Sequence, residues 1–393
     1  MFSLLLALIY VCFISLGLPD SLLGAVWPTL YVDMNVPMSY AGIISTVISV
    51  FTILSSLLSD TMSKKLGAGP LTAVSVLMTA VGMFGFGLSK KFWMVIAWSI
   101  PYGLGAGGVD AVLNNYVALH FKARHMNWLH CSWGVGASVS PYIMSFALTH
   151  LGSWSSGYFS VSLLQMALSL VVFLSLPLWK KREAVAMADG EETRTEPIKL
   201  KEIFSIRGAL PSFFAFFAYC SLELSTSLWA SSYLVKQRGV NEETAAALAS
   251  MFYIGITLGC VVNGFLTMRF GDRALVRTGF GIVAAGILLV FLPFHNVLPM
   301  VGFVVIGLGC APIYPCILHM TPDIFGREYS QAMIGFQMAF ANAGFCIAPP
   351  LFGVIAERVS IGLLPFYLVG LLAVMVLMCE LMVARAAKRR VAG

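Results

Sequence analysis

The chain has 393 residues, of which 59% are hydrophobic and 11% charged, and its formal net charge is +6. Charged residues make up about a quarter of a soluble domain, so this composition excludes a soluble globular protein. A membrane span needs roughly 20 apolar residues in a helix, whereas strands of a membrane barrel are much shorter. The sequence therefore predicts an all-α membrane protein.

The apolar segments predict about twelve transmembrane helices. The first lacks a basic leading region and continues past the usual length of a signal peptide, so we expect it to be a spanning helix. The predicted spans are 4–31, 39–59, 70–89, 92–119, 128–150, 155–178, 209–234, 245–268, 277–294, 299–319, 331–355 and 361–383.

Positive charge is distributed unevenly between the two sides that these spans define. With a cytoplasmic N-terminus, 19 of the 24 Lys and Arg residues fall on the cytoplasmic side, and the remaining five are Lys90, Lys91, Lys236, Arg238 and Arg358. Because cytoplasmic loops carry an excess of Lys and Arg, we expect both termini in the cytoplasm and a multi-pass protein of the bacterial inner membrane.

One long polar stretch, residues 180–207, divides the spans six and six. It predicts an N-terminal six-helix bundle at 1–179, a solvated and partly helical cytoplasmic linker at 180–207, and a C-terminal bundle at 208–393. The halves repeat in register: DSLLGAVWPTLYV matches ELSTSLWASSYLV, YGLGAG matches IGLGCA, and both the fifth and the eleventh span place Gly five residues before Pro. Parallel repeats of this kind are the construction of major facilitator carriers.

Two acids lie within predicted spans, Asp20 in the first and Asp110 in the fourth. A charge at the bilayer centre costs about 2.5–3.5 kcal/mol even on the insertion scale, so such residues are functional candidates by default. Asn114 follows Asp110 by one helical turn on the same face, and Gly103 and Gly107 form a small-residue edge for a neighbouring helix. A carboxyl held in a low dielectric is suited to exchanging a proton, although hydrogen bonding for packing alone remains an alternative.

Aromatic and polar side chains accompany the two acids. Trp27 follows Asp20 by about two turns, and an acid beside an aromatic ring is a common way to hold a polar ring with hydroxyl groups. In the fifth span His130 and Trp133 share a face, where His130 is either a titrating group or a neutral hydrogen-bonding one. The candidate binding residues in the second half are Glu223, Trp229, Tyr314, Gln337 and Asn342.

Other classes of function find no support in the sequence. GLGAGG lies inside a span and follows no strand, so its glycines indicate packing and not a nucleotide loop. The eight cysteines have no metal-ligand spacing, which favours neither a metal site nor disulfides. We therefore expect no enzyme activity, no cofactor, no metal and no nucleic-acid partner, and an ion gradient as the energy source.

At these residues the sequence resembles the fucose–proton symporter (sugar permease) family of the major facilitator superfamily. The resemblance covers nearly the whole chain and depends on GLPDSLLGAVWP, GLGAGGVDAVLNNYV, NWLHCSWGVGASVSP and EL…W…SYL. It implies that Asp20 and Asp110 serve sugar binding and proton coupling and that Asn114 is a site residue. His130 and Trp133 stand where the family has a Gln/Asn pair. In the loop after the second span, the position of the superfamily's usual Asp holds Lys64, and the repeat in the second half has Met268.

These observations lead to one main hypothesis and three alternatives. The main hypothesis is a monomeric carrier in the lipid bilayer that imports a hexose, deoxy-hexose or related small polyol with a proton by alternating access. Asp110 is the expected protonation site, and Asp20 the expected substrate or coupling acid. The alternatives are coupling to Na⁺, export of amphipathic compounds such as drugs, and a transporter-like receptor that binds a solute without moving it.

Overall fold

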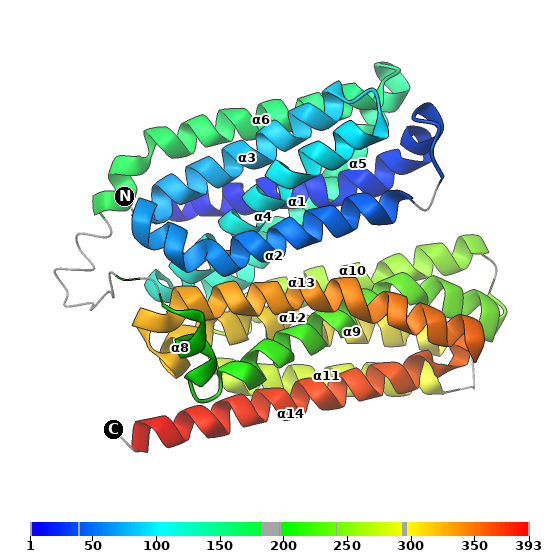
Figure 1. Cartoon of the computed structure of the whole chain (residues 1–393). Helices are drawn as coiled ribbons and strands as arrows, with labels where there is room; N and C mark the ends of the chain where they lie inside the picture. The colour runs from blue at the N-terminus through cyan, green and yellow to red at the C-terminus, as the bar shows by residue number, and fades with distance from the viewer. Residues whose placement is uncertain are drawn as a thin grey trace. The chain divides into compact units, whose positions relative to one another are not determined.

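The computed structural model describes residues 2–37, 40–181, 196, 198–240, 242–292 and 297–391. These residues form helices joined by short turns (Figure 1). The helices are α1 (Phe2–Asp33), α2 (Ala41–Leu66), α3 (Ala68–Leu88), α4 (Phe92–His120), α5 (Ala123–His150), α6 (Trp154–Leu174), α8 (Leu200–Ser205), α9 (Ala209–Arg238), α10 (Glu242–Leu266), α11 (Asp272–Phe291), α12 (Val297–Phe325), α13 (Arg327–Arg358) and α14 (Leu364–Val391), with a 3₁₀ turn, η2 (Ile361–Leu363), before the last.

Twelve of these helices in the described part of the chain are long, as the sequence predicts. Ten are also apolar enough over their length to cross a membrane, and α10 contributes a shorter apolar stretch, Met251–Leu266. Several helices begin before the predicted span: α5 begins at Ala123 and α11 at Asp272. The helices are longer than the predicted spans because hydropathy identifies only the part of a helix that crosses lipid. Beyond that part, a charged residue can begin the helix, since an acid such as Asp272 is favourable in the first turn.

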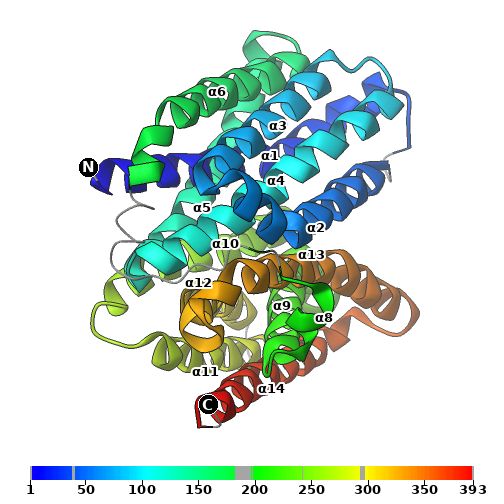
Figure 2. The same cartoon turned by 60° about the vertical axis from the view of Figure 1, so that its left-hand side comes forward.

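The chain divides into two compact units. Unit 1 contains residues 1–116, 129–198 and 327–335, and unit 2 contains 117–128, 199–326 and 336–393. The division near residue 198 lies inside the predicted linker, most of which falls outside the described residues. In unit 1, α3 lies along α6, and in unit 2, α12 lies between α10 and α11 while α14 lies along α9 (Figures 1 and 2).

Glycines allow two helices of unit 1 to cross at van der Waals distance. A Cβ on Gly17 of α1 would overlap the backbone carbonyl oxygen of Trp133 in α5, and a Cβ on Gly136 would overlap the carbonyl oxygen of Ile14. The two glycines therefore face each other's helix at a single crossing, and any side chain at either position would force the backbones apart. This crossing fixes the distance between α1 and α5 near Asp20.

The predicted small-residue edge of α4 packs against α2. Gly103 and Gly107 both meet the backbone of α2, at Ile48 and Thr52. The hydroxyl of Thr52 donates to the carbonyl oxygen of Gly103 at 3.2 Å, a bond that only a close approach of the two helices permits. The prediction of a close helix contact at this edge is therefore confirmed.

In unit 2, glycines likewise allow α11 and α12 to pack closely. A Cβ on Gly279 or Gly286 would meet the backbone of α12, at Gly309 and Gly302 respectively. The end of α11 is capped by a cation, because the guanidinium of Arg238 donates to the carbonyl oxygen of Val290 at 2.7 Å. The C-terminal carbonyls of a helix lack partners within the helix, and the hydroxyl of Tyr233 donates to the same oxygen at 3.3 Å.

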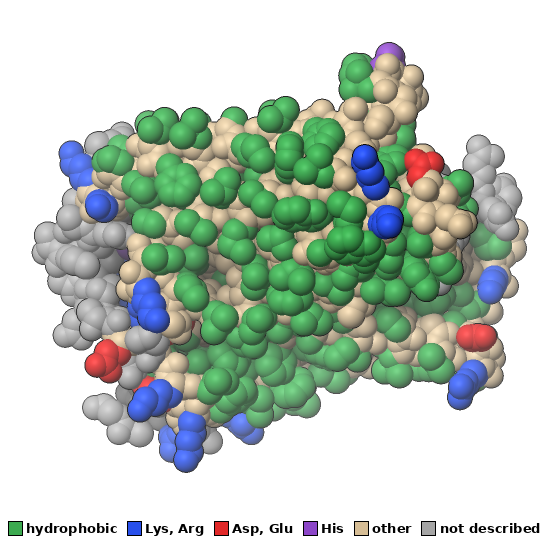
Figure 3. Space-filling model, turned by 45° about the horizontal axis from the view of Figure 1, so that its top comes forward, with side chains coloured by type: hydrophobic (Ala, Val, Ile, Leu, Met, Phe, Trp, Pro, Cys, Tyr) green, Lys and Arg blue, Asp and Glu red, His purple; other side chains and the backbone are tan. Residues whose placement is uncertain are grey.

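Hydrophobic side chains cover the lengths of the helices, and charged side chains gather near the helix ends (Figure 3). Exposed apolar residues include Leu163, Leu170 and Leu174 on α6. Large exposed apolar surfaces are unfavourable in water and are expected where a protein meets lipid. The chain is thus a multi-pass membrane protein.

The C-terminal end of α2 has a role that the sequence did not indicate. Asp60 and Lys64, one helical turn apart in α2, form an ion pair at 2.8 Å. Lys64 also donates to the carbonyl oxygen of Glu196 at 2.8 Å, and the backbone N–H of Ile198 donates to Asp60 at 3.0 Å. The pair therefore anchors the end of the linker to α2 within unit 1.

Candidate functional site

The first part of the candidate site is the carboxylate of Asp20 on α1. The indole N–H of Trp133 donates to its Oδ2 at 2.7 Å, and the hydroxyl of Tyr102 donates to its Oδ1 at 3.0 Å. Each oxygen thus has one donor from a different helix, α5 and α4. Asp20 is exposed to solvent and Tyr102 is buried. A carboxylate oxygen has two acceptor lone pairs, so each oxygen of Asp20 can accept a further hydrogen bond from a solute.

The second part of the site is a short chain of hydrogen bonds that begins at Asp110 on α4. The amide nitrogen of Asn114 donates to Asp110 Oδ1 at 2.7 Å and to the Asp110 carbonyl oxygen at 2.9 Å. These two bonds direct the amide oxygen to His130, whose Nε2 lies 3.1 Å away. An amide oxygen only accepts, so His130 Nε2 carries a hydrogen. Asn114 has no exposed surface, and its position is therefore fixed by Asp110 and His130.

The two parts lie together in unit 1. They meet on α5, where Trp133 bonds to Asp20 and His130, one turn before it, bonds to Asn114. The structure thus brings together five of the residues that the sequence singled out, from α1, α4 and α5. They offer carboxylate acceptors and a half-buried aromatic ring, which is a suitable lining for a polar solute with hydroxyl groups.

In unit 2 the predicted residues are more dispersed. Glu223 is half-buried on α9 and lies one turn after Tyr219, whose hydroxyl donates to the carbonyl oxygen of Cys310 at 3.2 Å. The ring of Tyr219 lies 5.4 Å from that of Tyr314, whose hydroxyl contacts the sulfur of Met338 at 3.0 Å. Glu223, Tyr219 and Tyr314 form a second polar and aromatic group.

Gln337 does not belong to a solute-facing group. Its side chain has no exposed surface; its amide nitrogen donates to the hydroxyls of Ser212 at 2.7 Å and Thr321 at 3.0 Å. These bonds satisfy the amide inside unit 2 and give Gln337 a packing role, while its contact with a substrate stays a prediction. Trp27 is also buried, with 5% of its surface exposed, and its ring lies 6.2 Å from that of Tyr31. It offers little surface for the predicted stacking on a solute.

Trp229 and Asn342 keep part of their surface exposed but bond to the backbone of α13. The indole N–H of Trp229 donates to the carbonyl oxygen of Pro349 at 3.0 Å, and its ring packs 5.7 Å from Phe352. The amide of Asn342 donates to the carbonyl oxygen of Met338 at 3.0 Å. The Trp229 bond joins α9 to α13, whereas the Asn342 bond lies within α13, and the role of both side chains toward a solute stays a prediction.

Sequence reasoning missed Tyr102 and Tyr219 as site residues. Tyr219 lies four residues before Glu223 and so shares its helix face, a spacing that was available in the sequence. Tyr102 opens the YGLGAG segment, which indicated only a repeat, and its partner Asp20 is 82 residues away. Among the described residues, no group of three or more His, Cys, Asp or Glu could hold a metal ion.

Family models and known proteins agree with this architecture. Residues 9–241 and 212–392 each match the model of the Major Facilitator Superfamily. The chain belongs to the major facilitator superfamily. It is 24% identical over 409 residues to Bypass of stop codon protein 6 of Saccharomyces cerevisiae. This alignment covers 95% of this chain and 79% of the yeast protein. It is 25% identical over 292 residues to the glucose/mannose transporter GlcP of Bacillus subtilis, with 72% of this chain and 70% of GlcP covered.

Solved structures show the same fold. Two crystal structures of FucP, the fucose:proton symporter of E. coli, superimpose with TM-scores of 0.79 and 0.77. The matches cover 96% and 97% of this chain and 98% of FucP in both cases, at 14% and 15% sequence identity. The predicted architecture, a twelve-helix major facilitator fold, is confirmed.

Proposed function

We propose that the protein is a secondary active transporter that imports a hexose, a deoxy-hexose or a related small polyol together with a proton. The observation that carries the proposal is the presence of two hydrogen-bonded carboxyls in unit 1: Asp20 is held by Tyr102 and Trp133, and Asp110 is connected through Asn114 to His130. The similarity to GlcP and FucP supports the sugar class.

Asp20 has the geometry of a solute contact. Its two oxygens are already oriented by one donor each, so hydroxyl groups of a sugar can donate to the remaining lone pairs without a rearrangement of the carboxylate. The half-buried ring of Trp133 lies beside it and can pack against the C–H face of a pyranose. Tyr102 and Trp133 therefore act as positioning residues for Asp20.

Asp110 has the geometry of a proton-binding group. The amide of Asn114 donates to one of its oxygens, and the other can take a proton. A carrier that closes around a charged carboxylate must desolvate that charge, whereas a protonated acid passes through the closed state at a lower cost. Protonation of Asp110 would therefore permit reorientation of the loaded carrier. Release of the proton from Asp110 would complete the import cycle.

The test is uptake into proteoliposomes with an inward proton gradient, using a panel of hexoses, deoxy-hexoses and polyols. Accumulation should depend on the gradient and collapse with a protonophore. Asp110→Asn should abolish accumulation but retain exchange of labelled for unlabelled sugar, because exchange needs no net proton movement. Accumulation that persists in Asp110→Asn would remove Asp110 from the coupling step.

Two control experiments separate this proposal from its rivals. Replacement of Na⁺ by choline leaves proton-driven uptake unchanged but stops a sodium-coupled carrier. Competition between the sugar panel and a panel of amphipathic cations distinguishes a sugar carrier from a drug exporter. If the cations inhibit the uptake of labelled sugar and the unlabelled sugars do not, the sugar assignment is contradicted.

A further inference from the structure

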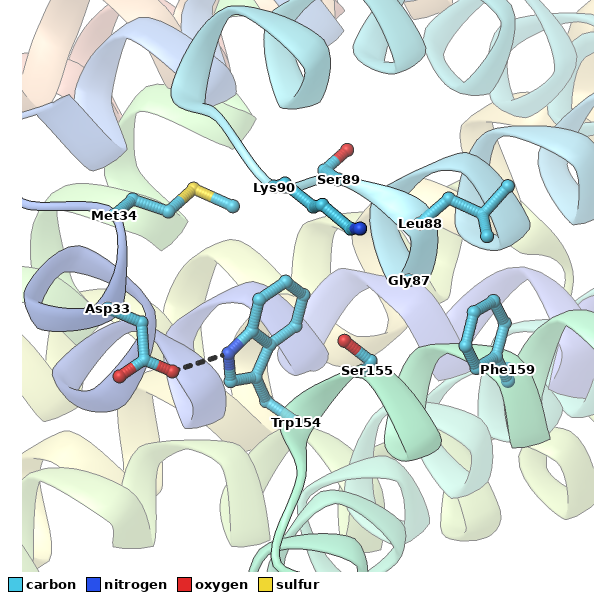
Figure 4. A pocket seen from close by; sticks show the side chains of 9 residues that line it. All are labelled: Asp33, Met34, Gly87, Leu88, Ser89, Lys90, Trp154, Ser155 and Phe159. Carbon is cyan, nitrogen blue, oxygen red and sulfur yellow. Dashed lines mark hydrogen bonds between the residues drawn. The ribbon is translucent and has the colours of Figure 1, made fainter.

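A cavity that the transport site does not use lies in unit 1, at the end where α1 finishes and α6 begins (Figure 4). Its volume is about 420 Å³, within the range of about 300–1,000 Å³ for small-molecule sites. The walls come from the end of α1, the turn between α3 and α4, and the first turns of α6. Since these are the ends of spanning helices, the cavity lies at the level of lipid headgroups.

Opposite charges line this cavity. Asp33, the last residue of α1, accepts a hydrogen bond from the indole N–H of Trp154 at 2.7 Å. The bond orients the carboxylate and leaves its second oxygen for a ligand. Lys90 lines the same cavity, and no described residue pairs with its ammonium group. The hydroxyl of Ser155 also points to this space without a partner among the described residues (Figure 4).

The remaining wall is apolar. Leu88, with 47% of its surface exposed, and Phe159 line one side of the cavity, away from Asp33. A soluble zwitterion would gain nothing from this wall, whereas the first methylenes of an acyl chain would bury apolar surface there. A cation for a phosphate, a carboxylate for an ammonium group and an apolar exit together match a lipid with a zwitterionic headgroup.

We propose that this cavity binds the phosphoethanolamine headgroup of a membrane lipid. Lys90 and Ser155 would bind the phosphate, and the primary ammonium group would donate to Asp33 and lie against the face of Trp154. Charge-assisted hydrogen bonds are about twice as strong as neutral ones, and a cation on an indole face adds to them. Phosphatidylglycerol has no ammonium group for Asp33, so the site should prefer phosphatidylethanolamine.

The test is native mass spectrometry of the full-length protein in detergent, titrated with dioctanoyl phosphatidylethanolamine or dioctanoyl phosphatidylglycerol. We expect a single retained phosphatidylethanolamine molecule and an affinity about tenfold higher than that for phosphatidylglycerol, the effect of one ionic hydrogen bond. Asp33→Asn keeps an acceptor for Trp154 but removes the charge, and should abolish this preference. Equal binding of the two lipids by the unaltered protein would overturn the proposal.

The chain provides a matched control in two adjacent lysines. Lys90 lines the cavity, whereas Lys91 is equally exposed on the same turn but does not line it. Lys90→Gln should lower the affinity for phosphatidylethanolamine about tenfold, and Lys91→Gln should leave it unchanged. Equal effects of the two substitutions would mean that the lipid responds to the general surface charge of this turn, and would overturn the site.

The source of the headgroup is tested by competition. Glycerophosphoethanolamine, a phosphodiester that has the same charges but no acyl chain, should fail to displace the lipid at matched concentrations. Displacement would mean that the apolar wall contributes nothing and would refute a lipid as the occupant. The proposal does not depend on which solute the carrier transports, because the cavity shares no residue with the site around Asp20 and Asp110.

Discussion

The crossing of α1 and α5 gives a sharp prediction about the candidate site. In Gly17→Ala the new methyl group would overlap the backbone carbonyl oxygen of Trp133. Backbone cannot rotate away as a side chain can, so the helices must separate by on the order of 1 Å to restore van der Waals distance. The indole of Trp133 donates to Asp20 at 2.7 Å, and the same separation would place the two groups beyond hydrogen-bonding distance.

Two free energies follow from this separation. Overpacking of a well-packed interior costs about 1–3 kcal/mol, which should lower the thermal stability of the purified protein. A hydrogen bond to a charged group contributes about 1.5–3 kcal/mol, equivalent to about 10- to 150-fold in affinity. If Asp20 contacts the solute, Gly17→Ala should weaken solute binding within that range.

Gly24→Ala is the matched control on the same helix, because a Cβ at Gly24 meets nothing within 4 Å. Alanine is the better helix former by about 1 kcal/mol, so this variant should be as stable as the parent or more so. Thermal melting in detergent measures the stability. The sugar concentration that gives half-maximal exchange in proteoliposomes measures the binding. Equal melting temperatures for Gly17→Ala and Gly24→Ala would refute the tight crossing; normal exchange by a destabilised Gly17→Ala would refute the role of Asp20.

Three further substitutions test other parts of the structure. Asn114→Leu removes the amide between Asp110 and its neighbour on α5, so proton-driven accumulation should fall at least about tenfold in proteoliposomes; unchanged accumulation would contradict the role of the amide. Asp60→Asn removes the charge that anchors the end of the linker and should destabilise the protein by about 1–3 kcal/mol, whereas the exposed Lys65→Gln should not change its melting temperature; similar shifts would refute the anchor. Gln337→Leu should lower the melting temperature through unsatisfied hydroxyls but leave the half-maximal sugar concentration unchanged, and a large change in that concentration would return Gln337 to the solute site.

Contacts within one helix were predictable from the sequence. The spacing of Asp110 and Asn114 placed them on one face of α4, and the structure joins them by a hydrogen bond of 2.7 Å. Gly103 and Gly107 predicted a close helix neighbour in the same way. In each case the period of the helix alone decides which side chains share a face, and no knowledge of the partner helix is required.

Contacts between helices were not predictable. Tyr102 donates to Asp20 across 82 residues of sequence, and the pairing depends on how α1 and α4 pack. Gln337 shows a second limit of the sequence. A polar residue within a span indicates that a polar partner exists, but not whether that partner is a solute or, as here, the hydroxyls of Ser212 and Thr321.

The burial of Gln337 sharpens the contrast between the two units. With Gln337 assigned to packing, the polar candidates of unit 2 reduce to Glu223 with its tyrosines, whereas unit 1 keeps two carboxyls, each with its own donors. Asp110 has no acidic counterpart in the second half, while Asp20 corresponds to Glu223. Under the proposed function, the acid without a counterpart, Asp110, is therefore the candidate for proton exchange, and Asp20 and Glu223 are the candidate solute contacts, each within its own unit.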